Sequence, residues 1–283
     1  MKERFCVPNL PSSKVARVFV SGIMPFDLRD ELKSLGITPH KLGQSKNLSS
    51  ELAFHPDILL NNFKKGVWLC EHDAKYLPKD LPRKWFLESE TELGELYPYD
   101  CAFNNFKIRN ALVCGRGVDY MIRAYAEYDE QLIILVAQNY TKCCTVIVNN
   151  FAIITSDISI AKAMRKNGFD VLTIEDSCEI GLRGYSHGLI GGCAGKINND
   201  TIAFTGNLER YKFGKDIISF CDNHGVDCIS LTDRPMYDYG GILPITEYIK
   251  DDDDDDSDDI SEEIKLAEDL YIEQLLEECR RNT

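Results

Sequence analysis

The sequence predicts an α/β fold of five strand–strand–helix–strand units, in which the first and last segments of the body pair to complete one unit. Three observations predict it. A hairpin pattern recurs four times, a helix–glycine–strand pattern follows it in several units, and a lone strand pattern stands near each end of the body. Self-similarity at a period of 20–50 residues is typical of repeat architectures.

The hairpin pattern consists of an apolar stretch, an Asn-Asn pair and a second apolar stretch. It occurs in residues 57–70, 101–114, 145–157 and 193–206. The Asn pairs begin at residues 61, 104, 149 and 198, at intervals of 43, 45 and 49 residues. The apolar stretches suit strands, and Asn with its Lys, Asp or Gly neighbours tolerates turn conformations. We therefore predict a β-hairpin in each segment, with its turn at the Asn pair and these neighbours.

A helical pattern that ends at a glycine and continues into a short apolar strand is found in residues 32–42, 164–174 and 220–231. The glycines are Gly36, Gly168 and Gly225, where a helix C-cap needs a left-handed residue. The second unit lacks this pattern, because prolines and charges interrupt residues 73–95. We expect an irregular segment there.

The remaining unit is divided between the two ends of the body. A single apolar strand pattern at residues 16–22 precedes the first helix, and the missing hairpin arm is found at residues 239–246. Pairing these two arms gives a fifth unit. The alternative is an ordinary mixed α/β domain in which Asn-Asn hairpins recur by chance.

Most of the negative charge lies in the C-terminal tail. The net charge is −14, and the residues from 251 onward carry 15 acidic and three basic side chains, which leaves −2 for the body. A nearly neutral body without a basic stripe argues against a nucleic-acid partner. We expect a body at 11–249, an acidic linker at 250–259 and an amphipathic helix at 260–283 that docks on the body or on a protein partner. The alternative is a frayed acidic end.

The N-terminal residues have no apolar signal core, and no stretch has the apolar length of a membrane span. We therefore expect a cytoplasmic protein that binds no membrane. The 11 cysteines should then be free thiols. None of them forms a CxxC pair, so neither a metal site nor a cofactor is predicted.

Five such units divided between the termini resemble the pentein fold, a five-bladed α/β propeller. This is the fold of arginine deiminases, agmatine deiminases, amidinotransferases and dimethylarginine dimethylaminohydrolases, which modify guanidino groups. The resemblance covers residues 11–249 and is strongest to an uncharacterised clostridial-type family grouped with that superfamily. It implies a central site in which a Cys attacks the guanidinium carbon, a His acts as acid and base, and carboxylates orient that His and bind the substrate.

The resemblance carries over to particular residues. His187, in Ser186-His187-Gly188-Leu189, matches the catalytic His, and Asp100, fifteen residues before Gly115, matches the orienting carboxylate. Asp57 resembles the family's substrate-binding Asp, and Asn104, Gly240 and Gly241 are further predicted substrate-binding residues. Arg183, in the loop before His187, could line the same pocket; the alternative is a solvated loop. The acidic residue that often follows the family's His by two positions is replaced by Leu189.

The nucleophile does not carry over, because Pro244 stands where the thiol should be. Two hypotheses follow. In the one we favour, the protein is a pentein that binds a small molecule or a partner without the family's catalysis. In the other, it is a hydrolase of guanidine- or amidine-type C–N bonds. Cys193 or Cys101 would then be the nucleophile, with His187 and Asp100 retained in their family roles. Cys193 shares a face with His187 if the segment is extended, but only a reversal at Gly191-Gly192 would bring them together.

Overall fold

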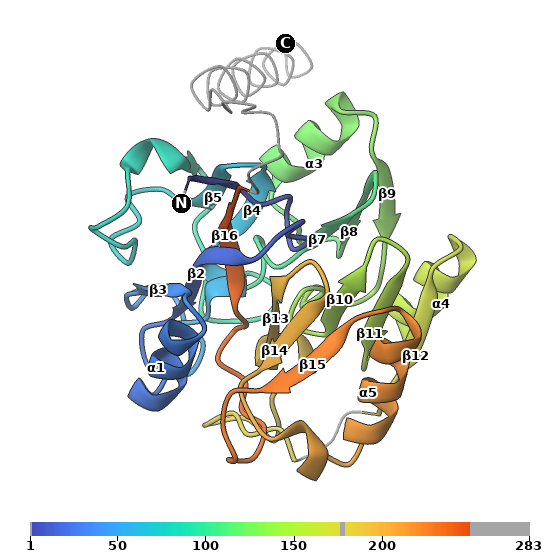
Figure 1. Cartoon of the computed structure of the whole chain (residues 1–283). Coiled ribbons are helices and arrows are strands. Elements are labelled where there is room, and N and C mark those ends of the chain that lie inside the picture. Colours follow the sequence, from blue (N-terminus) through green and yellow to red (C-terminus); the bar gives the residue numbers. More distant parts are fainter. Residues whose placement is uncertain (1, 176–178, 250–283) are drawn as a thin grey trace, which may run out of the picture.

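The computed structural model describes residues 2–175 and 179–249. The expected acidic linker at 250–259 and helix at 260–283 lie outside the described residues. Within them the chain forms a mixed α/β fold of small sheets (Figure 1).

Four three-stranded sheets share one strand order, in which an antiparallel hairpin is followed by a parallel third strand. The strands of the second and third units are β4 (Asn61–Lys64), β5 (Val67–Glu71), β6 (Phe86–Ser89), β7 (Phe106–Ile108), β8 (Ala111–Cys114) and β9 (Leu132–Leu135). Those of the fourth and fifth units are β10 (Thr145–Asn149), β11 (Ala152–Thr155), β12 (Asp170–Thr173), β13 (Ala194–Asn198), β14 (Thr201–Phe204) and β15 (Asp227–Ser230). All four predicted hairpins are thereby confirmed.

The remaining sheet joins the two ends of the body. Its order is β1-β16-β2-β3, formed by β1 (Glu3–Phe5), β2 (Val15–Ser21), β3 (Thr38–Leu42) and β16 (Leu243–Tyr248). The strand β16 pairs antiparallel with β2, and β3 pairs parallel with β2, so the predicted pairing of the terminal arms is confirmed. We call β16-β2-β3 the first unit. The strand β1 extends the sheet with residues that precede the boundary expected at 11.

Helices connect the second and third strands of four units. They are α1 (Phe26–Ser34), α3 (Tyr120–Tyr128), α4 (Ile158–Lys166) and α5 (Gly214–Asn223). Side chains of Asp119 and Asp157 cap the N-termini of α3 and α4. Gly36, Gly168 and Gly225 follow the helix ends with positive φ, as predicted. In the second unit this position holds the 3₁₀ turn η1 (Arg83–Trp85), so the expected irregular segment is confirmed.

The positions of two hairpin turns differ from the prediction. In the fourth and fifth units the turn does follow the first residue of the Asn pair. In the second unit the Asn pair lies inside β4 and the turn falls at Lys65-Gly66, and in the third unit the pair precedes β7. Gly66 and Arg109 supply the positive φ that these turns need. Asn61 is buried instead, and its amide donates to Phe103 O.

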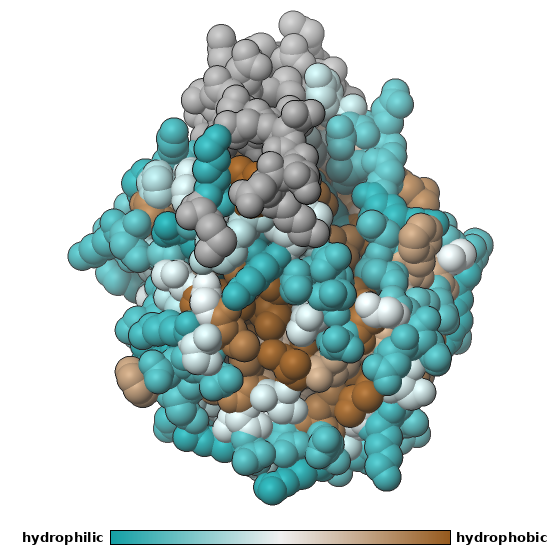
Figure 2. Space-filling view, in the orientation of Figure 1, coloured by the Kyte–Doolittle hydropathy of each residue, from teal (hydrophilic) through white to brown (hydrophobic). Residues whose placement is uncertain are grey.

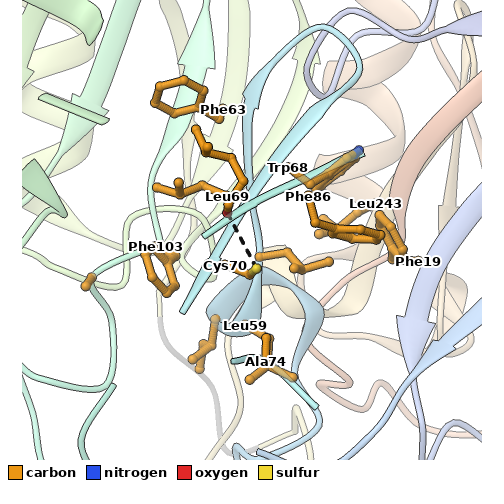
Figure 3. Close-up of a cluster of buried hydrophobic side chains, with 14 of the residues drawn as sticks. Phe19, Leu59, Phe63, Trp68, Leu69, Cys70, Ala74, Phe86, Phe103 and Leu243 are labelled. Carbon is orange, nitrogen blue, oxygen red and sulfur yellow. Dashed lines mark hydrogen bonds between the residues drawn. The ribbon is translucent and has the colours of Figure 1, made fainter. Parts of the chain in front are cut away.

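The core is rich in aromatic side chains near the second unit. Figure 3 shows Phe19, Trp68 and Phe86 packed beside Leu243, which connects β16 with the second sheet. The rings of Phe19 and Trp68 meet edge to face, with centroids 4.8 Å apart. Burial of these side chains holds the first and second units together.

Hydrophobic residues gather in the middle of the face shown in Figure 2, around β13 and β16, and hydrophilic residues surround them. Among residues 2–175 and 179–249, no helix is both long and apolar enough to cross a membrane.

Candidate functional site

A buried polar cluster lies where the first strands of the five units begin. Asp57 lies in the short helix α2 (Pro56–Leu59) before β4, Asn104 precedes β7, and Lys142 and Cys143 precede β10. Because equivalent residues of repeated units occupy equivalent places, residues far apart in sequence meet here.

Hydrogen bonds at this level join each unit to the next and the fifth unit to the first. They run from Asp57 N to Gly240 O (3.1 Å), Asn104 Nδ2 to Asp57 O (2.7 Å), Cys143 N to Asn104 Oδ1 (3.2 Å), Gly191 N to Cys143 O (2.7 Å) and Gly241 N to Gly192 O (2.8 Å). Four of the five predicted binding residues, Asp57, Asn104, Gly240 and Gly241, therefore lie in one hydrogen-bonded circuit.

Asp57 is buried at the centre of this cluster. Its Oδ2 accepts a hydrogen bond from the Cys143 thiol at 3.1 Å, while its Oδ1 has no hydrogen-bond partner. Burial and, second, the nearby carboxylate of Asp238 raise the pKa of Asp57. Burial and the negative charge of Asp57 likewise raise the pKa of the Cys143 thiol well above its ordinary value. The pair therefore favours a protonated thiol.

Asp238 holds the surrounding backbone. Its carboxylate accepts hydrogen bonds from Leu189 N at 2.8 Å and Gly240 N at 2.9 Å. The ring nitrogen Nδ1 of the buried His55 lies 3.7 Å from Asp238 Oδ1, which is an ion-pair distance but longer than a hydrogen bond. Sequence reasoning did not select Asp238; its one local signal is its place just before Gly240-Gly241.

Lys142 brings a positive charge into the cluster. Its side chain is buried, and burial lowers the pKa of its ammonium, against the attraction of Asp57, Cys143 and Asp238. Within the described part of the chain, the ammonium has no hydrogen-bond partner. Lys142 was not predicted, because a single Lys next to two cysteines carries no recognisable motif.

Lys142 lines two narrow hollows. One is also lined by Asp57, Asn61, Asn62 and Asn105, and the other by Pro244, Lys196 and mostly apolar residues; Asn9 of the N-terminal segment lines both. Each hollow has room for about one water molecule. In this conformation neither holds a molecule the size of arginine.

Asp100 has a partner other than the predicted one. Its Oδ2 accepts a hydrogen bond from the Tyr140 hydroxyl, and its Oδ1 is buried without a partner. Burial and this contact raise the pKa of Tyr140. His187 is half-buried in the loop before β13, and its Nδ1 lies 3.0 Å from Ser186 Oγ.

The two candidate thiols donate to backbone carbonyls. Cys193 ends the 3₁₀ turn η2 (Ile190–Cys193), so the segment is coiled rather than extended, and its Sγ donates to Leu189 O at 3.4 Å. Cys101 donates to Pro98 O at 3.1 Å. Burial raises the pKa of both thiols. Since the thiolate is the nucleophile, neither environment activates these cysteines.

Arg183 lies apart from the buried cluster, and Pro244 lies at its edge. Arg183 is exposed, and its backbone N–H donates to the Tyr237 hydroxyl at 3.1 Å. Pro244 lies in β16 opposite Val18, next to an irregularity in the strand register. Such an irregularity is where a sheet tolerates the missing N–H of proline.

All nine cysteines in the described residues are free thiols. Over the same residues, no group of three or more His, Cys, Asp or Glu side chains is arranged to hold a metal ion.

Residues 19–243, most of the body, match the model of a family described as "Family of unknown function (DUF6873)". The chain belongs to this family. Among curated proteins no significant match to this DUF6873 chain is found.

Solved structures identify the fold of this DUF6873 member. Inosamine-phosphate amidinotransferase from Streptomyces griseus matches with a TM-score of 0.55 at 12% identity, over 87% of this chain and 98% of that one. Agmatine deiminase from C. jejuni matches with a TM-score of 0.48 at 9% identity, over 81% and 90%. The likeness to the amidinotransferase shows that this chain shares its fold, the pentein fold that the sequence predicted.

Proposed function

We propose that this protein is a five-bladed pentein ring that binds a small polar molecule at its centre and does not carry out covalent guanidino chemistry. The hydrogen-bonded circuit through Gly240, Asp57, Asn104, Cys143 and Gly191-Gly192 supports closure of the ring, because it connects the fifth unit back to the first.

The contact between Cys143 and Asp57 carries the functional part of the proposal. A thiol that donates to a buried carboxylate keeps its proton, so it is a poor nucleophile. The Cys143 thiol also occupies one oxygen of the Asp57 carboxylate, the group that would bind a guanidinium. Pro244, which lines the neighbouring hollow, has no nucleophilic group.

The groups around the first hollow define the class of ligand. Asp57 Oδ1, Asn61 Oδ1 and Asn62 Oδ1 are buried acceptors without partners, and the Lys142 ammonium is a donor beside them. Unpaired buried polar groups are costly, so a molecule that satisfies both kinds gains affinity. A zwitterionic or amide-bearing compound fits this set better than a simple cation. Because the space is narrow, the segment that carries Asn9 would move on binding.

The test combines turnover with binding on the full chain. Release of ammonia or alkylamine is measured with arginine, agmatine and methylarginines, and thermal shifts and calorimetry are measured with glutamine and citrulline as zwitterionic probes. We expect no turnover. We expect a zwitterionic probe to raise the melting temperature of the wild type and of the exposed-site control Lys162→Met, and not of Lys142→Met.

Two outcomes would overturn the proposal. Turnover that is lost in Cys193→Ala, Cys101→Ala or Cys143→Ala would establish the hydrolase instead. Binding that is equal in Lys142→Met and in the wild type, or no binding of any probe, would remove the central site. Circular dichroism of each variant separates loss of binding from loss of the fold.

A further inference from the structure

A basic hollow lies at the opposite end of the first strands from the polar cluster. The hollow is open to solvent, and its volume, including part of that open space, is about 710 Å³. The turns of three hairpins contribute to it, and its charged lining residues are Lys64, Lys65, Lys107, Arg109 and Asp129. Four basic side chains against one acidic side chain contrast with the nearly neutral body as a whole.

Aromatic rings and a carbonyl group hold several of these basic side chains in place. The Lys107 ammonium donates to Phe63 O and lies 4.6 Å from the centroid of the Tyr125 ring. The Arg109 guanidinium lies 4.5 Å from the centroid of the Phe151 ring. The contact with the Phe151 ring orients the Arg109 guanidinium and leaves it charged, so Arg109 contributes a positive potential to the hollow.

The described chain ends close to this hollow. Tyr248 in β16 is paired with Glu3 in β1, and Ile249 N donates to Lys2 O. Further along β1, Phe5 packs against the turn of the second unit: a Cβ on Gly66 would lie 2.9 Å from its ring. Gly66 adjoins Lys65, so the chain leaves the described body at the end of the molecule where the hollow opens.

The residues that follow have the opposite charge. Eight of the nine residues in 251–259 are aspartate. At about 3.3 Å per extended residue, a nine-residue segment reaches up to about 30 Å, which exceeds the few strand widths between β16 and the second-unit turn. Attachment to the same chain also gives the segment a high effective concentration at the hollow.

We propose that the acidic segment 251–259 binds in the basic hollow of its own chain, against Lys64, Lys65 and Arg109. The attraction is the sum of several partly exposed ion pairs, each of them weak, so it is sensitive to salt. The basic hollow lies at the end of the molecule opposite the proposed ligand site. Binding of the acidic segment there does not depend on that site.

Zero-length carbodiimide crosslinking of the dilute full chain, followed by peptide mass spectrometry, tests the proposal. We expect crosslinks within one chain between the aspartates of 251–259 and Lys64 or Lys65 at about 20 mM salt, reduced several-fold at about 500 mM salt because charges are then screened. The double variant Lys64→Glu/Lys65→Glu should lose them. The matched control Lys162→Glu/Lys166→Glu, exposed on α4, should keep them.

A second measurement does not depend on crosslinking chemistry. Replacing the eight aspartates of 251–259 by asparagine should remove most of the salt dependence of the melting temperature below 500 mM. Crosslinks mainly to lysines elsewhere, crosslinks only between chains, or equal salt dependence in the two proteins would each overturn the proposal.

Discussion

Gly192 lies where two segments of the buried cluster are in close contact. A Cβ built on Gly192 would stand 1.9 Å from Asp238 Oδ1, well inside contact distance. The carboxylate cannot move away freely, because it accepts hydrogen bonds from Leu189 and Gly240. The absence of a side chain at residue 192 thus lets Asp238 hold the backbone around the candidate site.

Gly192→Ala should destabilise the protein by about 2 kcal/mol or more, because overpacking forces the Asp238 network to shift. Urea unfolding followed by circular dichroism measures the loss. Gly168→Ala is the matched control: its φ is +80° and no atom lies within 4 Å of the added Cβ. Backbone strain alone should cost it about 1 kcal/mol. Equal losses in the two variants would contradict the steric explanation.

The sequence could place residues of separate units near one another only where the repeat gave them a position. Asp57, Asn104 and Gly240 stand at the start of recognisable hairpin units, and the structure brings them together. Lys142 and Asp238 were missed. Their importance comes from burial and from partners in other units, which no local pattern encodes.

At the scale of elements, lysines on the first strands connect neighbouring sheets. Lys107 in β7 donates to Phe63 O in β4, and Lys196 in β13 donates to Val148 O in β10 at 2.8 Å. Burial lowers the pKa of Lys107 to about 7 and that of Lys196 to about 8. Each ammonium satisfies a carbonyl of the preceding unit in place of a strand partner.

Lys107→Met should change how stability depends on pH. The unfolded lysine titrates near pH 10.4 and the folded one near 7, so between these values the unfolded state binds more protons and stability rises with pH. The wild type should therefore gain stability relative to Lys107→Met from pH 7 to 9, by on the order of 1 kcal/mol per pH unit.

Urea unfolding of both proteins at several pH values measures this difference. The buried thiols act in the opposite direction, because unfolded cysteines ionise first, but they contribute equally to both proteins. Lys162→Met, at an exposed position, should follow the wild type. A difference between wild type and Lys107→Met that stays constant with pH would contradict the effect.

At the scale of the whole molecule, the N-terminal segment is bound to the last strand through one carboxylate. The buried Glu247 in β16 accepts hydrogen bonds from Arg4 Nε at 2.9 Å, Ser12 N at 2.6 Å, Ser12 Oγ at 2.6 Å and Ser13 N at 3.0 Å. Charge-assisted hydrogen bonds are stronger than neutral ones. This carboxylate holds the segment between β1 and β2, which includes Asn9, a residue that lines both hollows beside Lys142.

Glu247→Gln should therefore lower the free energy of unfolding by about 2 kcal/mol, because one amide replaces two acceptor oxygens and leaves donors unsatisfied. Chemical denaturation measures the loss, and hydrogen exchange at Ser12 and Ser13 should become faster. The exposed Glu209→Gln provides the control and should change stability by less than about 0.5 kcal/mol. Unchanged exchange at both serines would show that Glu247 does not hold this segment.

The sequence alone determined the units, their order and the pairing of the two terminal arms, because alternating polarity, glycine caps and turn residues act over a few positions. It misjudged two hairpin turns, since Asn61 was drawn into tertiary hydrogen bonds and Gly66 supplied the turn instead. Tertiary structure alone decided which groups meet in the buried polar cluster. The contacts of Cys143 with Asp57 and of Asp238 with Gly240 depend on how separate units pack, and burial then sets their protonation.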